Sequence, residues 1–173
     1  MIPSVTEEQV CIALRAFLLA ILPAGVEVVR GQSNRVPEPQ ADDYVIFWPV
    51  HRARISTNED TWDITNPDPA SLDHRRGTRT TFQLDIHGPN GADNAQVITT
   101  LWRDDYAMSA IDNSILVPLY ASDGQQMPFI NGEKQYEDRW VVTVEMQVNP
   151  VISTPAQFAD TVLPTIIVPV ELL

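Results

Sequence analysis

The side chains able to do chemistry are few and lie far apart in the sequence. Three histidines, His51, His74 and His87, occur in different segments without His-x-x-x-His spacing, so a zinc site would depend on the fold alone. The pairs Asp42–Asp43 and Asp104–Asp105 could in principle hold magnesium, but neighbouring side chains on a helix point about 100° apart and supply at most one useful ligand. The chain also lacks a glycine-rich phosphate loop and a Gly-x-Ser-x-Gly elbow. The sequence therefore predicts no catalytic residues, no metal site and no cofactor.

The charge balance is strongly acidic. The 173 residues include 11 Lys and Arg against 23 Asp and Glu, a formal net charge of −12. A surface with this charge repels phosphate, so we expect no specific binding of nucleic acid. The same charge suits a lining past which DNA slides without binding, and it equally suits plain solubility.

The cysteine content and the first residues bear on the compartment. Cys11 is the only cysteine, which excludes an intramolecular disulfide and a cysteine-based zinc cluster within one chain. It lies in a helical apolar pattern and is expected in the core. Glu7 and Glu8 stand where a signal peptide carries basic residues, and Arg15 breaks the apolar run that follows. We therefore expect synthesis in the cytoplasm. No run approaches the roughly 20 apolar residues of a membrane span.

The segment Thr81–Tyr106 organises the predicted fold. Apolar residues alternate with polar ones from Phe82 to Ile86, which is typical of a half-buried strand. Gly88–Gly91 ends that strand, because proline lacks an N–H and glycine loses too much chain entropy. Apolar residues then recur at three- and four-residue steps. This spacing predicts an amphipathic helix that packs back on the sheet, with Asp93 or Asn94 as its N-cap.

Another helix and several strands are expected around this unit. Thr6–Gln9 is a capping box, so a helix should begin there and run to Leu22, before Pro23. The expected strands are Val26–Arg30, Tyr44–Val50 with a continuation to Ser56, Ile115–Tyr120, Met127–Ile130 before an Asn131–Gly132 turn, and Trp140–Val148. Pro49 predicts an edge or a bulge and Pro118 an edge. The last strand alternates most cleanly, so it should be central and pair with the strand that contains Phe82.

Two segments do not fit a regular element. Residues 57–79 show no period and carry Trp62, which a purely mobile loop seldom needs, so we expect a protruding hairpin or arm that contacts another subunit. Residues 160–173 form an apolar tail that Pro164 and Pro169 interrupt, which prevents a helix. Such a tail suits strand addition to a neighbour or insertion into a groove; packing on its own sheet is the alternative.

These patterns predict one α+β domain over residues 1–173. It has a mostly antiparallel β-sheet flanked by the N-terminal helix and the central helix, and a long protruding loop at 57–79.

Several blocks of sequence, in their order and spacing, resemble the neck terminator family of tailed bacteriophages. They are Thr6–Leu22, Gly31–Pro39, Asp85–Gln96, and Gln147–Val151 with Pro155 and Phe158. The resemblance spans nearly the whole chain. It implies an α+β subunit similar to tail terminators, which form six-membered rings between the tail tube and the neck and are not enzymes.

The resemblance also implies partners. A virion ring of this kind, assembled in the host cytoplasm, contacts copies of itself, the tail tube protein, and a head–tail connector, adaptor or collar protein. A contractile tail adds the sheath. Genomic DNA passes through the lumen without specific binding, and no membrane is involved.

A ring needs two different surfaces that meet between neighbouring copies. One candidate surface is the 31–39 arm with the strand after it; the other is the long charged loop or the apolar tail. The residues assigned to these contacts are Asn34, Arg35, Pro37, Glu38, Phe47, Trp48, Trp62, Arg75, Arg76, Ile167 and Val168. Arg35 has a second interpretation as a local salt bridge that fixes the arm. The acidic residues Glu59, Asp60, Asp63 and Asp68 are predicted to face the lumen.

Two rival functions stay open at this stage. A head–tail adaptor or a stopper or collar protein would also form part of the neck. A small enzyme or ligand-binding module would need a deep pocket with convergent polar groups.

Overall fold

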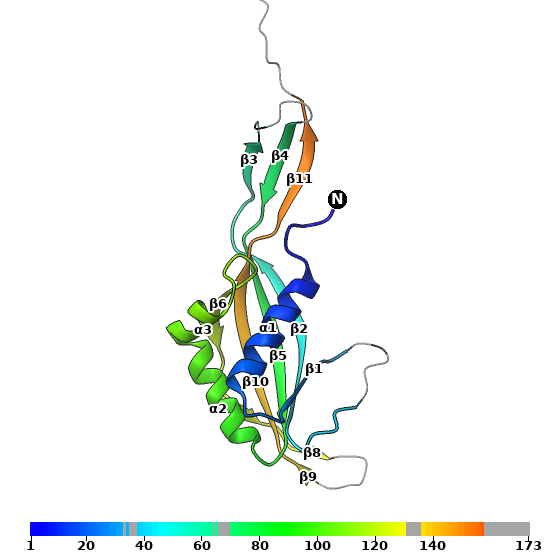
Figure 1. Cartoon of the computed structure of the whole chain (residues 1–173), viewed down its shortest axis with the longest axis vertical. Coiled ribbons are helices and arrows are strands. Elements are labelled where there is room, and N and C mark those ends of the chain that lie inside the picture. The colour runs from blue at the N-terminus through cyan, green and yellow to red at the C-terminus, as the bar shows by residue number, and fades with distance from the viewer. Residues whose placement is uncertain (33, 35–37, 64, 66–69, 131–135, 158–173) are drawn as a thin grey trace, which may run out of the picture.

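The body of the molecule is a mostly antiparallel sheet with helices on one face (Figure 1). The computed structural model describes residues 1–32, 34, 38–63, 65, 70–130 and 136–157. The sheet has the order β1-β2-β5-β10-β6, with β7 also paired to β10, and β1 runs parallel to β2. Its strands are β1 (Glu27–Arg30), β2 (Tyr44–Arg54), β5 (Thr78–His87), β6 (Val117–Ala121), β7 (Gln125–Gln126) and β10 (Arg139–Val148).

A second, smaller sheet projects from one end of the body (Figure 1). It consists of β3 (Glu59–Asp63), β4 (Ala70–Arg75) and β11 (Val151–Ala156) in the order β11-β4-β3. At the opposite end, β8 (Phe129–Ile130) and β9 (Tyr136–Glu137) form a two-stranded ladder. The molecule is therefore elongated, with its helices beside the body sheet and none beside the projecting one.

The helices are α1 (Glu7–Ile21), α2 (Gly91–Trp102) and α3 (Asp105–Ala110). Thr6 and Gln9 form the predicted capping box at the start of α1, where Thr6 Oγ1 accepts from Gln9 N at 3.3 Å. The α1 and α2 helices meet through Phe17 and Trp102, whose rings lie edge to face with centroids 5.5 Å apart. Both helices consequently cover the same face of the sheet. Within the described residues, no helix has the length and apolar character needed to cross a membrane.

The core lies between these helices and alternate residues of the central strands. Phe82, Leu84 and Ile86 on β5 are fully buried, and they sit beside Val142 and Val144 on β10. The odd-numbered residues of β5 point to the other face, away from the helices, as the two-residue period of a strand requires. One pair of long strands thus separates an apolar face from a polar one.

The predicted fold class is confirmed, and so are the main pairings. The strand with the cleanest alternation is β10, which pairs with β5 over ten residues and lies inside the sheet. The register of β2 shifts between Pro49 and His51, as proline in a paired strand predicts. Cys11 is buried in the core, and this burial raises the pKa of its thiol.

One local expectation was wrong, and two features were not predicted. The central helix begins at Gly91, one turn earlier than an Asp93 or Asn94 cap requires, because Asn94 N already donates to Asn90 O at 3.0 Å. The helical pattern is broken after Trp102, where Asp104 caps a separate α3 through Tyr106 N. The segment after Asn149–Pro150 is a strand, β11, which the sequence pattern did not suggest.

Replacing Leu84 with alanine should lower the free energy of unfolding by about 2–5 kcal/mol, because a fully buried leucine loses its contacts and leaves a cavity. The control is Val50→Ala on β2, whose side chain is 56% exposed and should cost under about 1 kcal/mol. Urea unfolding measures both. Equal losses would contradict the burial of Leu84.

Candidate functional site

Polar groups are buried on the face of the body sheet that lies away from the helices. Asp85 is only 4% exposed and forms an ion pair with Arg139 of the neighbouring β10. Its second oxygen accepts a hydrogen bond from Gln83 Nε2 at 2.8 Å. A buried carboxylate is costly unless it is paired and hydrogen-bonded, so the ion pair and hydrogen bond offset that cost on a sheet face that has no helix over it.

A second buried group on this face is His87, beside Tyr44. The two rings stack with centroids 4.6 Å apart, and both side chains meet the carboxylate of Glu137, at 3.1 Å from His87 Nδ1 and 2.8 Å from Tyr44 OH. Burial lowers the pKa of His87, although the hydrogen bond to Glu137 opposes that shift. Burial and the same carboxylate raise the pKa of Tyr44. Neutral His87 and neutral Tyr44 are therefore the stable forms near pH 7, where they fix Glu137 against the end of the sheet.

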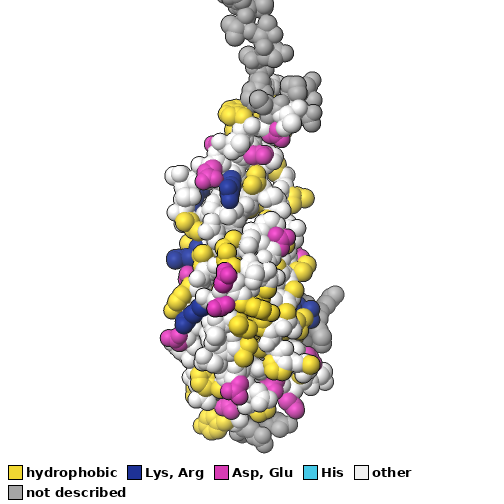
Figure 2. Space-filling model, turned by 60° about the vertical axis from the view of Figure 1, so that its left-hand side comes forward, with side chains coloured by type: hydrophobic (Ala, Val, Ile, Leu, Met, Phe, Trp, Pro, Cys, Tyr) yellow, Lys and Arg dark blue, Asp and Glu magenta, His cyan; other side chains and the backbone are white. Residues whose placement is uncertain are grey.

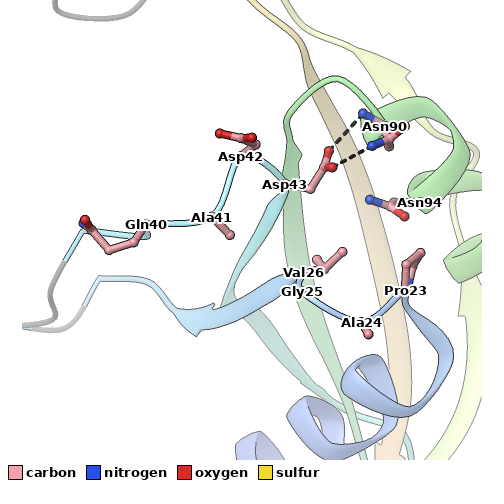
Figure 3. A pocket seen from close by; sticks show the side chains of 10 residues that line it. All are labelled: Pro23, Ala24, Gly25, Val26, Gln40, Ala41, Asp42, Asp43, Asn90 and Asn94. Atoms are coloured by element: carbon pink, nitrogen blue, oxygen red, sulfur yellow. Dashed lines mark hydrogen bonds between the residues drawn. The ribbon is translucent and has the colours of Figure 1, made fainter.

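A hollow of about 460 Å³ opens where three elements meet at this end of the body (Figure 3). Its walls come from the α1–β1 turn (residues 23–26), the segment before β2 (residues 40–43) and the start of α2. Asp43 holds the α2 end in place, because its two oxygens accept from Asn90 N at 2.9 Å and Asn90 Nδ2 at 2.7 Å. A second hollow of about 480 Å³ adjoins it, and Asp42 lines both.

Gly88 permits this close packing. Its φ of +107° is the left-handed region that favours glycine, and a Cβ there would collide with the carbonyl oxygen of Asp42 and with Asp43 Oδ1. The turn that ends β5 is thus fitted directly against the segment that begins β2.

The projecting sheet has an exposed edge strand, β3, and polar contacts that join its strands. All five residues of β3 are exposed, and Trp62 is 54% exposed. His74 on β4 links the strands, with Nδ1 2.8 Å from Asp60 and Nε2 3.2 Å from Thr154 Oγ1 on β11. Hydrogen bonds from Thr65 lower the pKa of Asp63, which keeps that exposed carboxylate charged.

The acidic residues predicted to face the lumen do not share one face of this sheet. Glu59 and Asp63 lie on one face of β3 and Asp60 on the other, since successive strand residues alternate. Arg75 is 3.6 Å from Glu59 across the strand pair. Asp68 lies outside the described residues. The prediction that all these acidic side chains point the same way therefore does not hold for Asp60.

The predicted interface residues fall into three groups. Phe47 is 1% exposed and packs in the core beside Phe82, so its side chain offers no contact surface; the alternation along β2 turns Trp48, half-buried, to the opposite face. The exposed residues are Asn34, Glu38, Trp62, Arg75 and Arg76. Those outside the described residues are Arg35, Pro37, Ile167 and Val168.

The described part of the chain holds no cluster of three or more His, Cys, Asp or Glu side chains that could bind a metal ion. The two hollows at the end of the body are open and lined by backbone turns and carboxylates. The arrangement offers surfaces for contact and supplies no nucleophile with an adjacent base.

The comparison with known families decides the class of protein. A family model described as phage neck terminator protein matches residues 9–171. The chain belongs to the phage neck terminator protein family. The resemblance drawn from the sequence is thereby confirmed, and this neck terminator is a structural component of the phage particle.

Comparisons with individual proteins show weaker similarity. No curated protein matches it. A cryo-EM structure of the sheath/tube terminator of an extracellular contractile injection system, PVC, in its extended state is similar, with 15% identity and a TM-score of 0.49. The match covers 97% of this chain, which spans 65% of that protein's length.

The turn at Gly88 gives a test of the hollow's geometry. Gly88→Ala and Gly25→Ala both place an alanine at positive φ, but the Gly25 site is open within 4 Å whereas Gly88 is in contact with Asp42 and Asp43. Gly25→Ala should cost about 1–2 kcal/mol of unfolding free energy, and Gly88→Ala about 2 kcal/mol more because of the collision. Urea unfolding compares them. A difference near zero would show that the turn and the β2 start are not tightly fitted.

The buried His87 predicts a pH dependence of stability. Its pKa is lowered from 6.5 in the folded state, so the unfolded chain takes up a proton first and stability falls as the pH drops below about 6.5. The loss is at most about 1.4 kcal/mol per pH unit for one group. Replacing His87 with glutamine should flatten the unfolding free energy between pH 7.5 and 5.5. The exposed His51→Gln control should keep the wild-type slope, and an equal slope in both variants would contradict the prediction.

Proposed function

We propose that copies of this chain form a six-membered ring at the neck of the phage, where the ring terminates the tail tube and joins it to the head–tail connector. The observation that carries the proposal is the family match over residues 9–171. The surfaces available to a partner are consistent with it, since the two hollows at the end of the body are open and carry carboxylates at their edges rather than enclosing a buried apolar cavity.

A closed ring needs head-to-tail contacts between two different patches. The exposed arm residues near Asn34 and Glu38, with Trp48, form one candidate patch. The projecting sheet, with Trp62, Arg75 and Arg76, forms the other. The undescribed tail that carries Ile167 and Val168 stays assigned to the same contacts.

The lumen is proposed to carry the acidic face of β3. Glu59 and Asp63 share that face, and the net charge of −12 adds to repulsion of the DNA backbone. DNA then passes without specific binding, because Arg75, the cation that shares that face in the described β3–β4 pair, lies 3.6 Å from Glu59 and is already paired with it.

The proposed partners follow from this position. They are the tail tube protein on one side of the ring and a connector, adaptor or collar protein on the other, with the sheath added where the tail is contractile. Assembly takes place in the host cytoplasm. An adaptor or stopper position one level nearer the head is the alternative.

A cryo-EM map of the intact neck tests the proposal. It should contain six copies of this chain in one ring on the last layer of tube subunits, with Glu59 and Asp63 toward the channel. Copies placed only on the head side, without contact to the tube, would favour the adaptor. Glu59 and Asp63 on the outer wall would exclude the lumen assignment, and a single copy per particle would overturn the ring.

A further inference from the structure

The two adjoining hollows at the end of the body are acidic. Asp42 and Asp43 line the first, and Asp42, Glu137 and Asp138 line the second. On the face seen in Figure 2, several acidic side chains lie toward this end. We call this surface the acidic hollow, defined by Asp42, Asp43, Asn94, Glu137 and Asp138.

Asp42 is the carboxylate in this surface that is free to bind a partner. Its side chain is exposed, and among the described residues it takes part in no hydrogen bond or ion pair. Asp43 and Glu137 differ, because Asn90 binds both oxygens of Asp43, and Tyr44 and His87 both bind Oε1 of Glu137. A cation brought to Asp42 would therefore meet an unpaired charge.

A second observation in the same hollow also points to a ligand. Asn94 is only 2% exposed, yet its Nδ2 has no hydrogen-bond partner in the described structure. The amide nitrogen points toward the interior of the hollow (Figure 3). A buried donor left unpaired costs about 1–3 kcal/mol, so an acceptor that reaches it would be favoured. Within a protein partner, the acceptor of this kind is a backbone carbonyl or a side-chain amide oxygen.

An anion is a poor occupant, although the hollow lies at the N-terminus of α2. Asp42, Asp43 and Asp93 surround that helix end and oppose the attraction of its free N–H groups. The combination of a free carboxylate with a buried donor instead suits a polypeptide segment that carries an arginine or a lysine. The guanidinium would pair with Asp42, and a carbonyl oxygen would accept from Asn94.

The same chain carries such a segment at the base of the projecting sheet. Arg54 ends β2, Arg76 lies between β4 and β5, and Arg79 follows at the start of β5. Arg54 and Arg79 line the same open hollow, and Arg76 lies two residues before Thr78, the residue opposite Arg54 in the register. We call these three residues the arginine strip.

The arginine strip contains guanidinium groups that are available to a partner. All three side chains are exposed, and Arg54 and Arg76 form no ion pair among the described residues, whereas Arg79 is 3.7 Å from Glu145. Arg54 and Arg79 also line an open hollow of about 470 Å³ with Ile55 and Leu119, which are 52% and 45% exposed. This is a concentrated cationic surface on a chain whose net charge is −12.

We propose that the acidic hollow of one copy receives the arginine strip of the next copy. The inference rests on the proposed ring and names its contact. The two patches lie on different parts of the chain, so the contact is head-to-tail, the type that generates closed rings. Their opposite charges set which surfaces meet, and juxtaposed like charges disfavour the reverse pairing.

Charge reversal on each patch tests the contact in assembled particles. The hollow variant is Asp42→Arg, and the strip variant combines Arg54→Asp with Arg76→Asp. Each is supplied in place of the wild-type chain during phage assembly, and electron microscopy counts the necks that carry a complete ring. Each variant alone should lower that fraction about tenfold, because every contact then juxtaposes like charges.

Rescue distinguishes a direct contact from simple damage. A chain with all three substitutions should restore the fraction of complete rings to within about twofold of wild type, because every contact is then reversed on both sides. An equal mixture of the two variants should also be rescued, since alternating copies make only matched contacts around an even-numbered ring. The control Asp105→Arg makes the same charge change on α3, outside both patches, and should assemble like wild type. Thermal unfolding verifies that every variant is folded.

The outcomes separate this inference from the proposed function. Rings formed normally by both single-patch variants would overturn the contact while leaving the ring intact. A defect in the hollow variant without rescue by the strip changes would mean that the hollow binds a different protein, which also overturns the inference. Wild-type necks without any ring would refute the proposed function itself.

Discussion

The register between β5 and β10 is the constraint on which the rest of the structure depends. Ten consecutive pairs, from His87 with Arg139 to Thr78 with Val148, fix which side chains face the helices and which face away. A slip by one residue would send Phe82, Leu84 and Ile86 to the opposite face. The same two strands continue into the projecting sheet, through Pro150 into β11 and back through Arg76 into β4, where Arg76 N donates to Pro150 O. One register therefore sets the core, the polar face and the root of the projection.

The face of the body sheet that lies away from the helices buries polar side chains in pairs. Asp85 and His87 lie at strand positions that would otherwise hold apolar residues, and each is buried against a neighbour-strand partner. Buried polar groups of this kind stabilise little beyond what their removal from water costs, but breaking one partner leaves an uncompensated group. Their effect is to hold the end of the sheet in one arrangement. That end carries the Asp42–Asp43 segment, so the surface proposed to receive the neighbouring copy is held in place by groups outside it.

The sequence predicted the body of the fold because burial leaves a period in it. The helix from Thr6, the bulge near Pro49 and the pairing of the Phe82 strand with the Trp140 strand all follow from apolar spacing or from proline. The projecting sheet left no such period, because β3 is exposed along its whole length and its pairing with β4 has no helix to pack against. The acidic hollow could not be predicted from the sequence either. Its walls are residues 23–26, 40–43 and 90–94, which are distant in sequence and meet only in the fold. Asp85 and His87 could be noticed as polar residues in a strand that was expected to be paired. Nothing in the sequence around Arg139 and Glu137 marks them as the partners of Asp85 and His87.

The distribution of charge bears on the ring proposed for this strongly acidic chain. Copies that each carry a net charge of −12 repel one another at long range, but ions screen that repulsion beyond a Debye length of about 8 Å at physiological ionic strength. Inside that distance the local pattern decides, and β2 separates Asp42, which precedes its first residue Tyr44, from Arg54 at its last residue. In the proposed ring, association is then weak in every orientation except the one that brings cations onto the free carboxylate. A surface of this type limits premature assembly in free solution and favours assembly where another component already holds the copies side by side, as the end of a tail tube would.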